Sequence, residues 1–366
     1  MTPLRVGTLL VRGFRNLADL TLTPGPRFNV IAGDNGQGKS NLLEAIEYVG
    51  SLGSFRGASA ADMIARAGEQ AEVGAVVHGG IAPSQVRVRL QRSAARELSV
   101  DGKRPRTRAS YLAAMQTVLF HPGDLQLTTG APELRRALLD RMLERFDPTY
   151  AATLAIYERA LRSRNRLLRS EPQDRHAIAA YHEVLASAGT VIGQARERLV
   201  SEFSPRVTET FGAISGEPER LSLRYEPRVS PELNALRAAL ELSFEKDLVR
   251  GFTAEGPHAD ELAFSLDRVS VKRYASQGQQ RAIVLAVKVA ELHELTQRVG
   301  RVPVLLLDDV SSELDKTRSR RLFSLLAELG GQVFLTTTQP ELILLEHERV
   351  DFCVEGGVVR TGQIRS

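Results

Sequence analysis

The sequence predicts an α/β fold, a mixed sheet with helices, into which a helical arm domain is inserted. Two observations predict the sheet: an apolar strand near residue 30 leads through a glycine-rich loop into a helix, and strands alternate with helices again after residue 277. A third predicts the insertion, because residues 111–248 are rich in Ala, Leu, Arg and Glu and show a strand pattern only near 221–225. We therefore divide the chain into 1–115, 116–250 and 251–366, with the first and last segments forming one unit.

The composition is that of a folded protein. The 366 residues are 43% hydrophobic and 25% charged, which excludes a disordered or collagen-like chain. The single cysteine, Cys353, excludes an internal disulfide and a cysteine-built zinc site, so we expect a cytoplasmic protein with Cys353 in its core. No apolar run approaches the length of a membrane span, and we expect no membrane partner.

The first 110 residues contain strand patterns around one helix. Residues 6–11, 20–22 and 27–32 are prone to form strands, and the last run ends in glycines. Apolar residues then recur at helical spacing from Leu42 to Val49. Alternation over 73–78 and 86–90, with Asp101 and Gly102 as a turn, indicates an antiparallel meander.

The middle of the chain predicts a helical hairpin, because periodic apolar runs over 134–161 and 178–203 are separated by a breaker at 170–174. In the last third, a helix over 277–298, a strand over 304–307, a helix over 316–329 and a strand over 332–337 follow one another. This alternation predicts a mostly parallel sheet.

Residues 33–40 read GDNGQGKS, the GxxxxGK[ST] pattern of a phosphate-binding loop. Glycines let the backbone fold around a polyphosphate with its N–H groups inward, Lys39 reaches the β and γ phosphates, and Ser40 ligates magnesium. The helix that begins there adds its positive N-terminal end. The expected nucleotide-binding residues of this loop are Gly33, Asp34, Asn35, Gly36, Gln37, Gly38, Lys39, Ser40 and Asn41.

The apolar strand 304–307 ends in Asp308 and Asp309, at the sheet edge where the phosphate loop also lies. Asp308 would hold the metal or its water, and Asp309 would position the attacking water. Acids after a strand are otherwise ordinary helix caps, and it is the phosphate loop that favours the catalytic interpretation.

Residues 274–281, YASQGQQR, open a helix with a serine and a polar, glycine-containing turn, which is a ready anion site. Placed between a phosphate loop and an aspartate strand, this segment resembles the signature loop of ATP-binding-cassette (ABC) ATPases, and 311–315, SSELD, resembles the loop that follows their aspartate strand. The resemblance implies an ABC-type P-loop ATPase head that binds ATP and Mg²⁺. Two chains would clamp two ATP molecules, with Ser276, Gly278 and Gln279 contacting the nucleotide of the partner.

Further segments resemble the RecF family, bacterial proteins of recombinational repair and replication restart. They are VRGFRNLADLTL (11–22), SFR (54–56), TVLFHPGDLQLTTGAPELRRALLD (117–140), RSRNRLLR (162–169), GPHADEL (256–262), SQGQQR (276–281) and LLDDVSSELD (306–315). The resemblance covers essentially the whole chain. It implies an ATP-driven homodimer that clamps duplex or gapped DNA and aids recombinase loading, together with recombination-mediator proteins.

Three departures from the family patterns bear on the mechanism. Asp309 replaces the Glu of the general ABC pattern, and residues 336–338, all Thr, replace its His, which implies a weak ATPase whose slow hydrolysis acts as a timer. Whether Asp309 is the catalytic base stays open. Gly123 replaces an acid that RecF relatives commonly carry, so Asp124 and Gln126 become the candidates in that loop.

The charge distribution points to DNA more strongly than the net charge of +4. Residues 87–108 hold eight basic and two acidic residues, and 158–169 hold five arginines against one glutamate. Each cluster either follows a phosphate backbone or is a solvated face. We assign DNA contact to Arg104, Arg106 and Arg108, and to Arg56 on resemblance alone.

Two other functions are compatible with the phosphate loop. A repair ATPase of the same superfamily with an associated nuclease would carry a cluster of metal-binding acids and histidines, and the sequence contains none. The energising subunit of a transporter would associate with membranes and ignore DNA. Four residues also keep two interpretations. His258 contacts nucleotide or DNA, or is a turn histidine. Arg12, Arg15 and Asn16 approach the nucleotide or the partner chain, or end a solvated strand.

Overall fold

The computed structural model describes residues 2–217, 220–310, 315–343, 345 and 348–362. The chain forms two compact units. The head unit comprises Met1–Asp124, Thr210–Glu217 and Ser276–Ser366, and the arm unit comprises Leu125–Glu209 and Pro218–Ala275. The segment boundaries expected from the sequence, after residues 115 and 250, therefore differ from the points after 124 and 275 at which the chain passes between the units.

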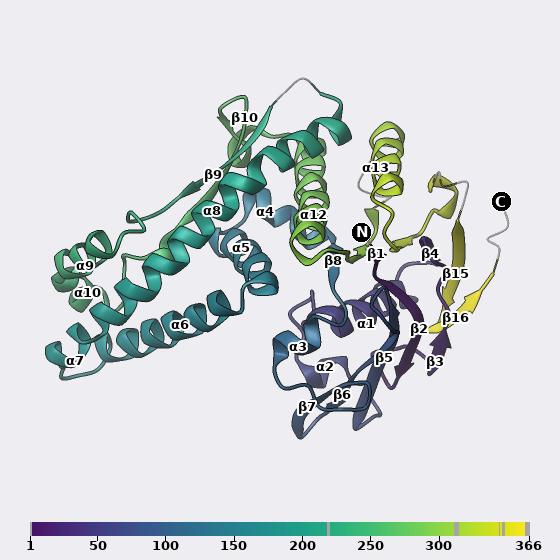
Figure 1. The fold of residues 1–366 in the computed structure, drawn as a ribbon, viewed down its shortest axis with the longest axis horizontal. Helices are drawn as coiled ribbons and strands as arrows, with labels where there is room; N and C mark the ends of the chain where they lie inside the picture. Colours follow the sequence, from purple (N-terminus) through teal and green to yellow (C-terminus); the bar gives the residue numbers. More distant parts are fainter. Residues whose placement is uncertain (1, 218–219, 311–314, 344, 346–347, 363–366) are drawn as a thin grey trace. The chain divides into compact units, whose positions relative to one another are not determined.

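The central sheet of the head unit has the strand order β16-β15-β4-β14-β13-β8 (Figure 1). Its strands are β4 (Phe28–Ala32), β8 (Thr117–Phe120), β13 (Val304–Leu307), β14 (Val333–Thr337), β15 (Arg349–Glu355) and β16 (Val358–Thr361). All neighbours are parallel except β15 and β16, which confirms the mostly parallel sheet. Because parallel strands end at one edge, the segments after β4 and β13 meet there.

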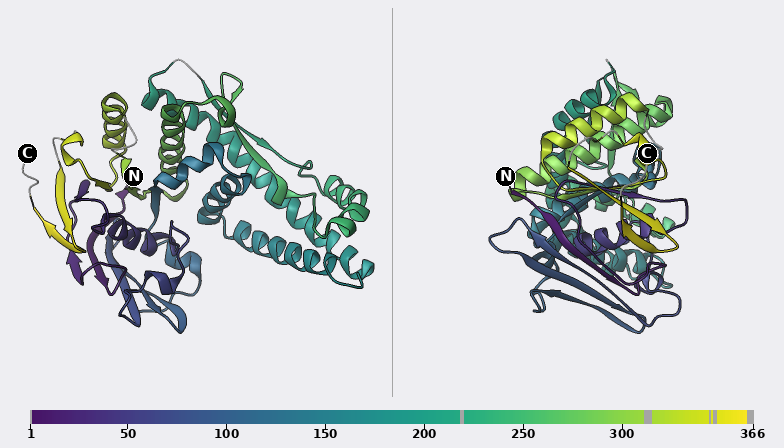
Figure 2. Two further views of the ribbon diagram at one scale, coloured as in Figure 1. Left: turned by 180° about the vertical axis from the view of Figure 1, so that it is seen from behind. Right: turned by 90° about the vertical axis from the view of Figure 1, so that its right-hand side faces the viewer.

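The second sheet of the head unit is antiparallel, with the order β3-β2-β5-β6-β7. Its strands are β2 (Arg5–Arg12), β3 (Leu20–Leu22), β5 (Gln70–His78), β6 (Ser84–Gln91) and β7 (Ala94–Val100). This is the predicted meander, extended by β7, and Asp101 and Gly102 turn with positive φ angles of 51° and 75°. The right-hand view of Figure 2 shows these strands side by side.

Helix α1 (Lys39–Ser51) lies between the two sheets and contacts β8 and β14 of one and β5 and β6 of the other. Ten of its thirteen residues are buried, so the helix is enclosed. The other helices of the head unit are α2 (Ala60–Met63), α3 (Arg108–Leu112), α12 (Gln277–Val299) and α13 (Lys316–Leu329), and the short strands β1 (Thr2–Pro3) and β12 (Arg301–Val302) pair in parallel.

The arm unit contains the predicted hairpin, in which α6 (Pro148–Leu168) turns back through α7 (Arg175–Ala179) into α8 (Tyr181–Ser215, its end in the head unit), and the two long helices diverge from that turn (Figures 1 and 2). Its other helices are α4 (Gln126–Thr129), α5 (Pro132–Phe146), α9 (Leu233–Leu242), α10 (Phe244–Arg250) and α11 (Val271–Tyr274). A small antiparallel sheet of β9 (Leu221–Glu226), β10 (Glu261–Leu266) and β11 (Val269–Ser270) completes it.

Strand pairing explains where the units differ from the expected segments. Strand β8 belongs to the head unit because it pairs with β13, although the sequence around it is helical. Residues 251–275 belong to the arm unit because β10 pairs with β9 along its whole length. Both pairings join segments that are far apart in the chain.

The expectation that Cys353 is a core residue is wrong. Cys353 is exposed, whereas its neighbours Phe352 and Val354 on β15 are buried. Successive side chains of a strand point to opposite faces, so the two apolar neighbours leave Cys353 on the outer face.

Candidate nucleotide-binding site

The loop between β4 and α1 has a backbone conformation that favours glycine at three positions. Gly33, Gly36 and Gly38 have φ angles of 152°, 79° and 118°, in the region that side chains disfavour. A Cβ atom at Gly33 would also collide with the carbonyl oxygen of Val354. Gly38 is the N-cap of α1, so the loop leads directly into the helix N-terminus, as the phosphate-loop pattern predicts.

The turn between β15 and β16 holds this loop in place, which the sequence did not predict. The backbone oxygen of Gln37 accepts a hydrogen bond from Gly357 N at 2.9 Å, and its side-chain Oε1 accepts one from Gly356 N at 2.7 Å. Gln37 is therefore a loop-positioning residue in the structure.

Lys39 lies against the loop that precedes it. Its Nζ donates to the carbonyl oxygens of Gly33 and Asp34 at 2.7 and 2.8 Å. Burial lowers the pKa of Lys39, and the nearby carboxylates of Asp309, Asp308 and Asp34 oppose that shift. The ammonium group of Lys39 is thus held at the loop among three acids, where it can bind the oxygens of a polyphosphate.

Asp308 connects the phosphate loop to the central sheet. Its Oδ1 accepts a hydrogen bond from Ser40 Oγ at 2.8 Å and another from Thr336 Oγ1 at 2.7 Å. Thr336 also accepts from the backbone N–H of Asp309 at 2.9 Å, so one threonine of β14 holds the carboxylate of Asp308 and the backbone of Asp309. In the sequence, Thr336 is marked only as a departure from the ABC pattern, which predicts no such role.

The adjacent Ser40 hydroxyl and Asp308 carboxylate fit Mg²⁺, because this ion prefers oxygen ligands and takes one or two from the protein. Asp309 has a φ angle of 53°, an uncommon conformation for a residue with a side chain. Such strain is found at functional sites, where the surrounding structure enforces it.

Asn41 and Arg56 form part of a second layer beneath the loop. Asn41 donates to Asn16 Oδ1 at 2.7 Å and accepts from Arg56 Nη1 at 2.6 Å. Arg56 lies 3.7 Å from the carboxylate of Glu44, which is fully buried and is also bound by Arg15 through two hydrogen bonds of 2.9 Å. Arg15 and Asn16 thus lie beside the loop, whereas Arg12 is the exposed last residue of β2.

Ser276 is the N-cap of α12. Its hydroxyl accepts from the backbone N–H of Gln279, whose side chain in turn accepts from the N–H of Ser276. Gln279 also donates a hydrogen bond to Glu217 at 3.5 Å. A Cβ atom at Gly278 would lie 2.7 Å from Nη1 of Arg318, so the glycine leaves room for that side chain. Within the described parts of the chain, the Ser276 hydroxyl bonds to no residue of the phosphate loop, so this set and the loop are separate in one chain.

Two further expectations concern loops near this site. Residues 311–314 of the SSELD segment lie outside the described residues. Asp124, a candidate after Gly123, is buried and pairs with Lys288 of α12 at 3.3 Å, and its carboxylate also accepts from His121 N at 3.0 Å. Gln126 is exposed at the start of α4.

The comparisons with known proteins agree with this geometry. Residues 5–357 match the family described as RecF/RecN/SMC N terminal domain. The DNA replication and repair protein RecF of Anaeromyxobacter sp. (strain Fw109-5) is 41% identical over 363 residues, covering 96% of this chain and 98% of that protein. This chain belongs to the RecF family. RecF of Myxococcus xanthus is 38% identical over 93% of this chain and 92% of its own length.

Solved structures support membership of the RecF family. Structures of the recombination mediator protein RecF in the RecFOR pathway, one with ATPrS and one with ATP, give TM-scores of 0.87 and 0.89 at 29% and 28% identity. Each covers at least 98% of both chains. The Smc head domain of Pyrococcus furiosus, with a TM-score of 0.59 and 18% identity, shares the fold. Among the described helices of this RecF-family chain, none is long and apolar enough to cross a membrane.

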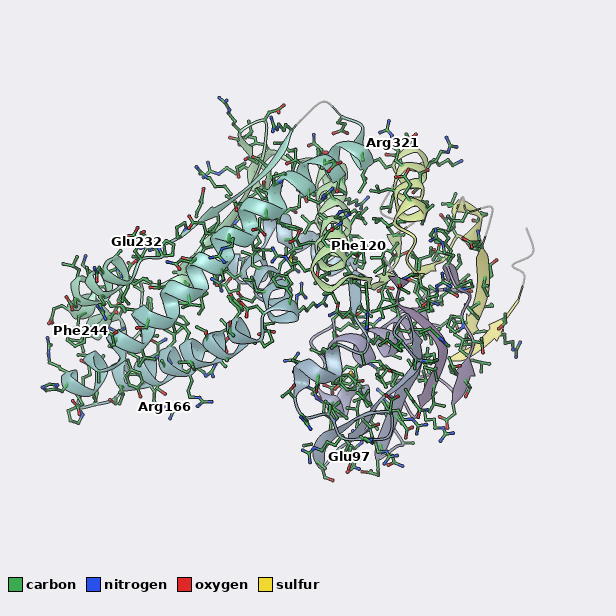
Figure 3. The ribbon with its side chains drawn as sticks, viewed as in Figure 1. Glu97, Phe120, Arg166, Glu232, Phe244 and Arg321 are labelled. Atoms are coloured by element: carbon green, nitrogen blue, oxygen red, sulfur yellow. The ribbon has the colours of Figure 1, made fainter. Side chains whose placement is uncertain are left out.

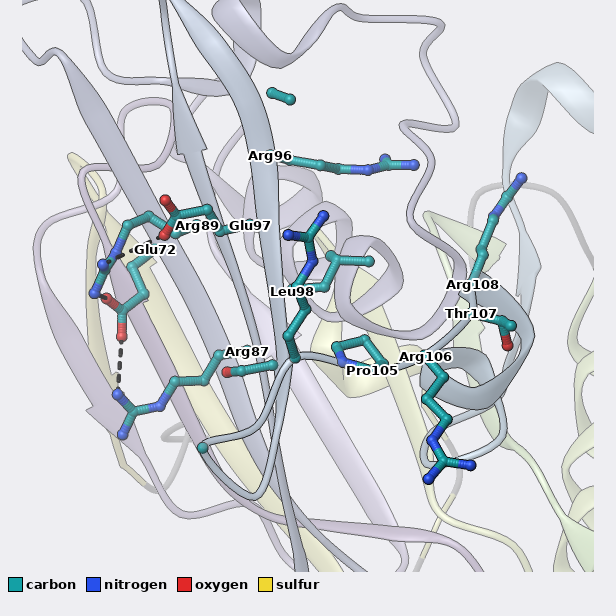
Figure 4. Close-up of a pocket in the computed structure, with 14 residues that line it drawn as sticks. Glu72, Arg87, Arg89, Arg96, Glu97, Leu98, Pro105, Arg106, Thr107 and Arg108 are labelled. Atoms are coloured by element: carbon teal, nitrogen blue, oxygen red, sulfur yellow. Dashed lines mark hydrogen bonds and ion pairs between the residues drawn. The ribbon is translucent and has the colours of Figure 1, made fainter.

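The arginines predicted to bind DNA line a cavity of about 940 Å³ on the antiparallel sheet (Figure 4). We call it the arginine pocket; its charged lining residues are Glu72, Arg87, Arg89, Arg96, Glu97, Arg104, Arg106 and Arg108. Glu72 pairs with Arg87 and Arg89 at 3.4 and 3.1 Å. Arg104 and Arg106 are exposed and have no ion-pair or hydrogen-bond partner among the described residues. The predicted trio is therefore gathered in one cavity, whereas Arg56 lies by the phosphate loop.

The second basic cluster of this RecF-family chain is only partly a surface. Arg166 is exposed on the outer side of α6 (Figure 3), but Arg164 is fully buried and pairs with Asp247 at 2.8 Å. His258 likewise has a structural environment: Nδ1 lies 2.7 Å from the Tyr157 hydroxyl and Nε2 lies 2.9 Å from Thr253 O. These contacts favour the turn-histidine interpretation.

Proposed function

We propose that this RecF-family chain binds ATP with Mg²⁺ at the loop 33–41 and uses it to form a DNA-binding homodimer. The observation that carries the proposal is the Ser40–Asp308 hydrogen bond of 2.8 Å beside the Lys39 ammonium. The RecF structures with ATP and ATPrS, of which this chain is a relative, support ATP as the nucleotide.

Each residue of the loop has a distinct task in this proposal. Backbone N–H groups at the start of α1 bind phosphate oxygens, and Lys39 leaves the carbonyl oxygens of Gly33 and Asp34 to contact the β and γ phosphates. Ser40 and Asp308 hold Mg²⁺, which when bound neutralises charge on the phosphate oxygens. Asp309 orients water, held by the bond from its backbone to Thr336.

Ser276, Gly278 and Gln279 complete the site of a second copy of the chain. Their support is the start of α12, where the capping box orders the turn. Ser276 makes no bond to its own loop among the described residues, which fits a group that acts across a dimer. Two copies facing each other would each supply this turn to the nucleotide of the other.

Hydrolysis in this proposal is slow and serves as a timer. Asp309 has a shorter side chain than the Glu of the ABC pattern, and the Thr336 hydroxyl is committed to Asp308 and Asp309. ATP binding would therefore close the dimer, and hydrolysis would release it later.

The dimer would bind duplex or gapped DNA through the arginine pocket and aid recombinase loading with recombination-mediator proteins. Arg104 and Arg106 provide cations that the described parts of the chain leave unpaired, and a dimer doubles them, so phosphate contacts act together. Arg56 would add a contact near the nucleotide.

Equilibrium binding tests the proposal. We expect a fluorescent ATP analogue to bind the chain in the presence of Mg²⁺ and to bind more weakly when EDTA removes it. A labelled duplex should bind more tightly with the analogue than without nucleotide. Nucleotide binding that is indifferent to Mg²⁺, or duplex binding that is indifferent to nucleotide, would contradict the proposal.

A further inference from the structure

The C-terminal end of α1 is bound by an arginine of the arginine pocket. Arg96 Nη1 donates to Leu52 O at 2.6 Å and to the Tyr48 hydroxyl at 3.2 Å. Arg108 Nη2 lies 3.4 Å from Ser51 O, the last residue of the helix. The last carbonyl oxygens of a helix lack partners within it and carry partial negative charge, so these cations stabilise the helix end.

Leu52, which ends the helix, depends on this contact. It is buried and has a φ angle of 60°, a left-handed conformation that usually requires glycine. Its backbone N–H is bonded to Tyr48 O within the turn, and its carbonyl oxygen faces Arg96. Leu52 therefore holds its strained conformation with its carbonyl oxygen bound by Arg96 of β7.

Arg96 has donors left for a second partner. A guanidinium group carries five N–H donors, and the hydrogen bonds of Arg96 to described residues all come from Nη1. The same side chain lines the arginine pocket together with Arg104 and Arg106 (Figure 4). Arg96 can thus hold the helix end with one nitrogen and an anion in the pocket with the others.

The pocket fits the phosphates of a DNA backbone better than an acidic peptide. Glu72, Arg87, Arg89 and Glu97 of its lining lie on the face of the sheet opposite Arg96, because successive side chains of a strand alternate (Figure 4). On the side of Arg96 the charged lining is Arg104, Arg106 and Arg108 with no acid, and Leu98, Ala95 and Pro105 are the apolar lining side chains among the described residues. Protein partners are usually anchored by aromatic and large apolar groups in well-packed pockets, whereas DNA backbones are bound chiefly by cations.

We propose that the arginine pocket is a phosphate-backbone site in which Arg96 bridges a DNA phosphate and the C-terminal end of α1. This rests on the proposed function, because the N-terminal end of the same helix begins the nucleotide loop. A phosphate that fixes Arg96 favours the capped helix, and a nucleotide that binds the helix N-terminus favours the same state. DNA and nucleotide binding are then coupled within one chain, in addition to any effect of dimerisation.

The coupling must be reciprocal. The factor by which nucleotide tightens DNA binding equals the factor by which DNA tightens nucleotide binding, because both are one coupling free energy. Helix α1 has thirteen residues, about 20 Å at 1.5 Å per residue, and it is enclosed by two sheets, so it can carry the coupling as a rigid element.

The experiment measures this factor in the Ser276→Arg chain, which removes the contribution of dimerisation. A labelled duplex is titrated with and without a slowly hydrolysed ATP analogue, and the analogue is titrated with and without duplex. We expect both factors to agree and to reach roughly fivefold or more. The mass of the protein is measured under the same conditions by light scattering.

Three variants separate the coupling from the affinity for duplex. Arg106→Ala, the matched control, removes a pocket arginine that does not touch α1, so it should weaken duplex binding and leave the factor unchanged. Arg96→Ala should abolish the factor. Arg96→Lys keeps the charge, but an ammonium group lacks the fixed fork of donors needed to bridge a DNA phosphate and the end of α1. This variant should therefore bind duplex and lose the coupling factor, and it serves as the test if Arg96→Ala is unstable.

The outcomes distinguish the two proposals. A factor near one in the Ser276→Arg chain, or an unchanged factor in Arg96→Lys, would overturn the coupling while leaving the DNA-binding function intact. Failure of the unaltered chain to bind duplex under any nucleotide condition would overturn both. The phosphate-backbone assignment would be overturned by an acidic peptide that competes with duplex for the arginine pocket, if binding at that pocket does not depend on the salt concentration.

Discussion

Ser40 Oγ and Asp308 Oδ1 are 2.8 Å apart and joined by a hydrogen bond, although 268 positions separate them in the chain. The bond joins the start of α1 to the end of β13, and the whole arm unit lies between them in the sequence. A head unit built from both ends of the chain therefore brings the phosphate loop and the aspartate strand to one sheet edge.

Replacing Lys39 with Met should weaken binding of an ATP analogue by roughly tenfold to a hundredfold, which corresponds to loss of about 1.5 to 3 kcal/mol from a charged hydrogen bond. Lys39→Arg should also fail, because guanidinium is larger and planar. Lys246→Met, which removes an exposed lysine of the arm unit, is the control. Analogue affinity in Lys39→Met equal to that of this control would remove Lys39 from the nucleotide site.

Ser276→Arg should bind the ATP analogue as a single chain yet fail to dimerise, because the substituted turn would no longer fit the nucleotide of the partner. The loss of the N-cap costs about 1 kcal/mol of stability, so melting temperature must be recorded as well. Ser276→Thr keeps both hydroxyl and cap and should dimerise. If Ser276→Arg loses nucleotide affinity as severely as Lys39→Met, the assignment of Ser276 to the partner site is wrong.

Local periodicity predicted the elements that carry the site. Strand 304–307 and helix 316–329 were predicted at their observed bounds, because a short buried strand and an amphipathic helix have distinct patterns. Strand β8 was missed, since its four buried residues, one Thr and three apolar, lie within a helical composition, and a short apolar run does not distinguish a strand from a buried helix.

Contacts between distant segments account for what the sequence did not reveal. Thr336 holds the carboxylate of Asp308 and the backbone of Asp309 through the pairing of β14 with β13, and no local pattern marks it. Arg164 looked like part of a basic surface until its partner Asp247, 83 positions away, accounted for its burial. Arg96 lies in the basic run 87–108, and only its contacts with Leu52 and Tyr48 in the structure distinguish it from the other basic residues of that run.

Neutralising Arg104, Arg106 and Arg108 together should flatten the salt dependence of duplex binding in the presence of an ATP analogue. Each phosphate contact that is lost reduces the slope of log affinity against log salt by up to about one unit, with little dependence on DNA sequence. Neutralising Arg159, Arg162 and Arg166 on α6 provides a matched control with the same change of charge. Equal slopes for the pocket variant and the unaltered chain would exclude the arginine pocket as the DNA surface.

Acid should destabilise the arm unit through His258. Burial, and then the charge of Arg136, lower the pKa of His258 below its ordinary value of 6.5, so the unfolded chain binds more protons than the folded one. The contribution of neutral His258 to the free energy of unfolding is therefore fully present above pH 6.5 and declines as the pH falls below that value. His258→Gln should flatten this decline in thermal melts recorded between pH 8 and pH 5. An equally steep decline in the variant would show that another group causes the decline. His182, whose pKa is also lowered by burial, is the next candidate.

The mass of the protein in solution shows whether the nucleotide joins two chains. Light scattering is recorded with Mg²⁺ alone, with Mg²⁺ and a slowly hydrolysed ATP analogue, and with both of these and duplex DNA. We expect one chain with Mg²⁺ alone, two chains with the analogue, and a complex of two chains with duplex when all components are present. The mass of one chain under every condition would contradict this expectation.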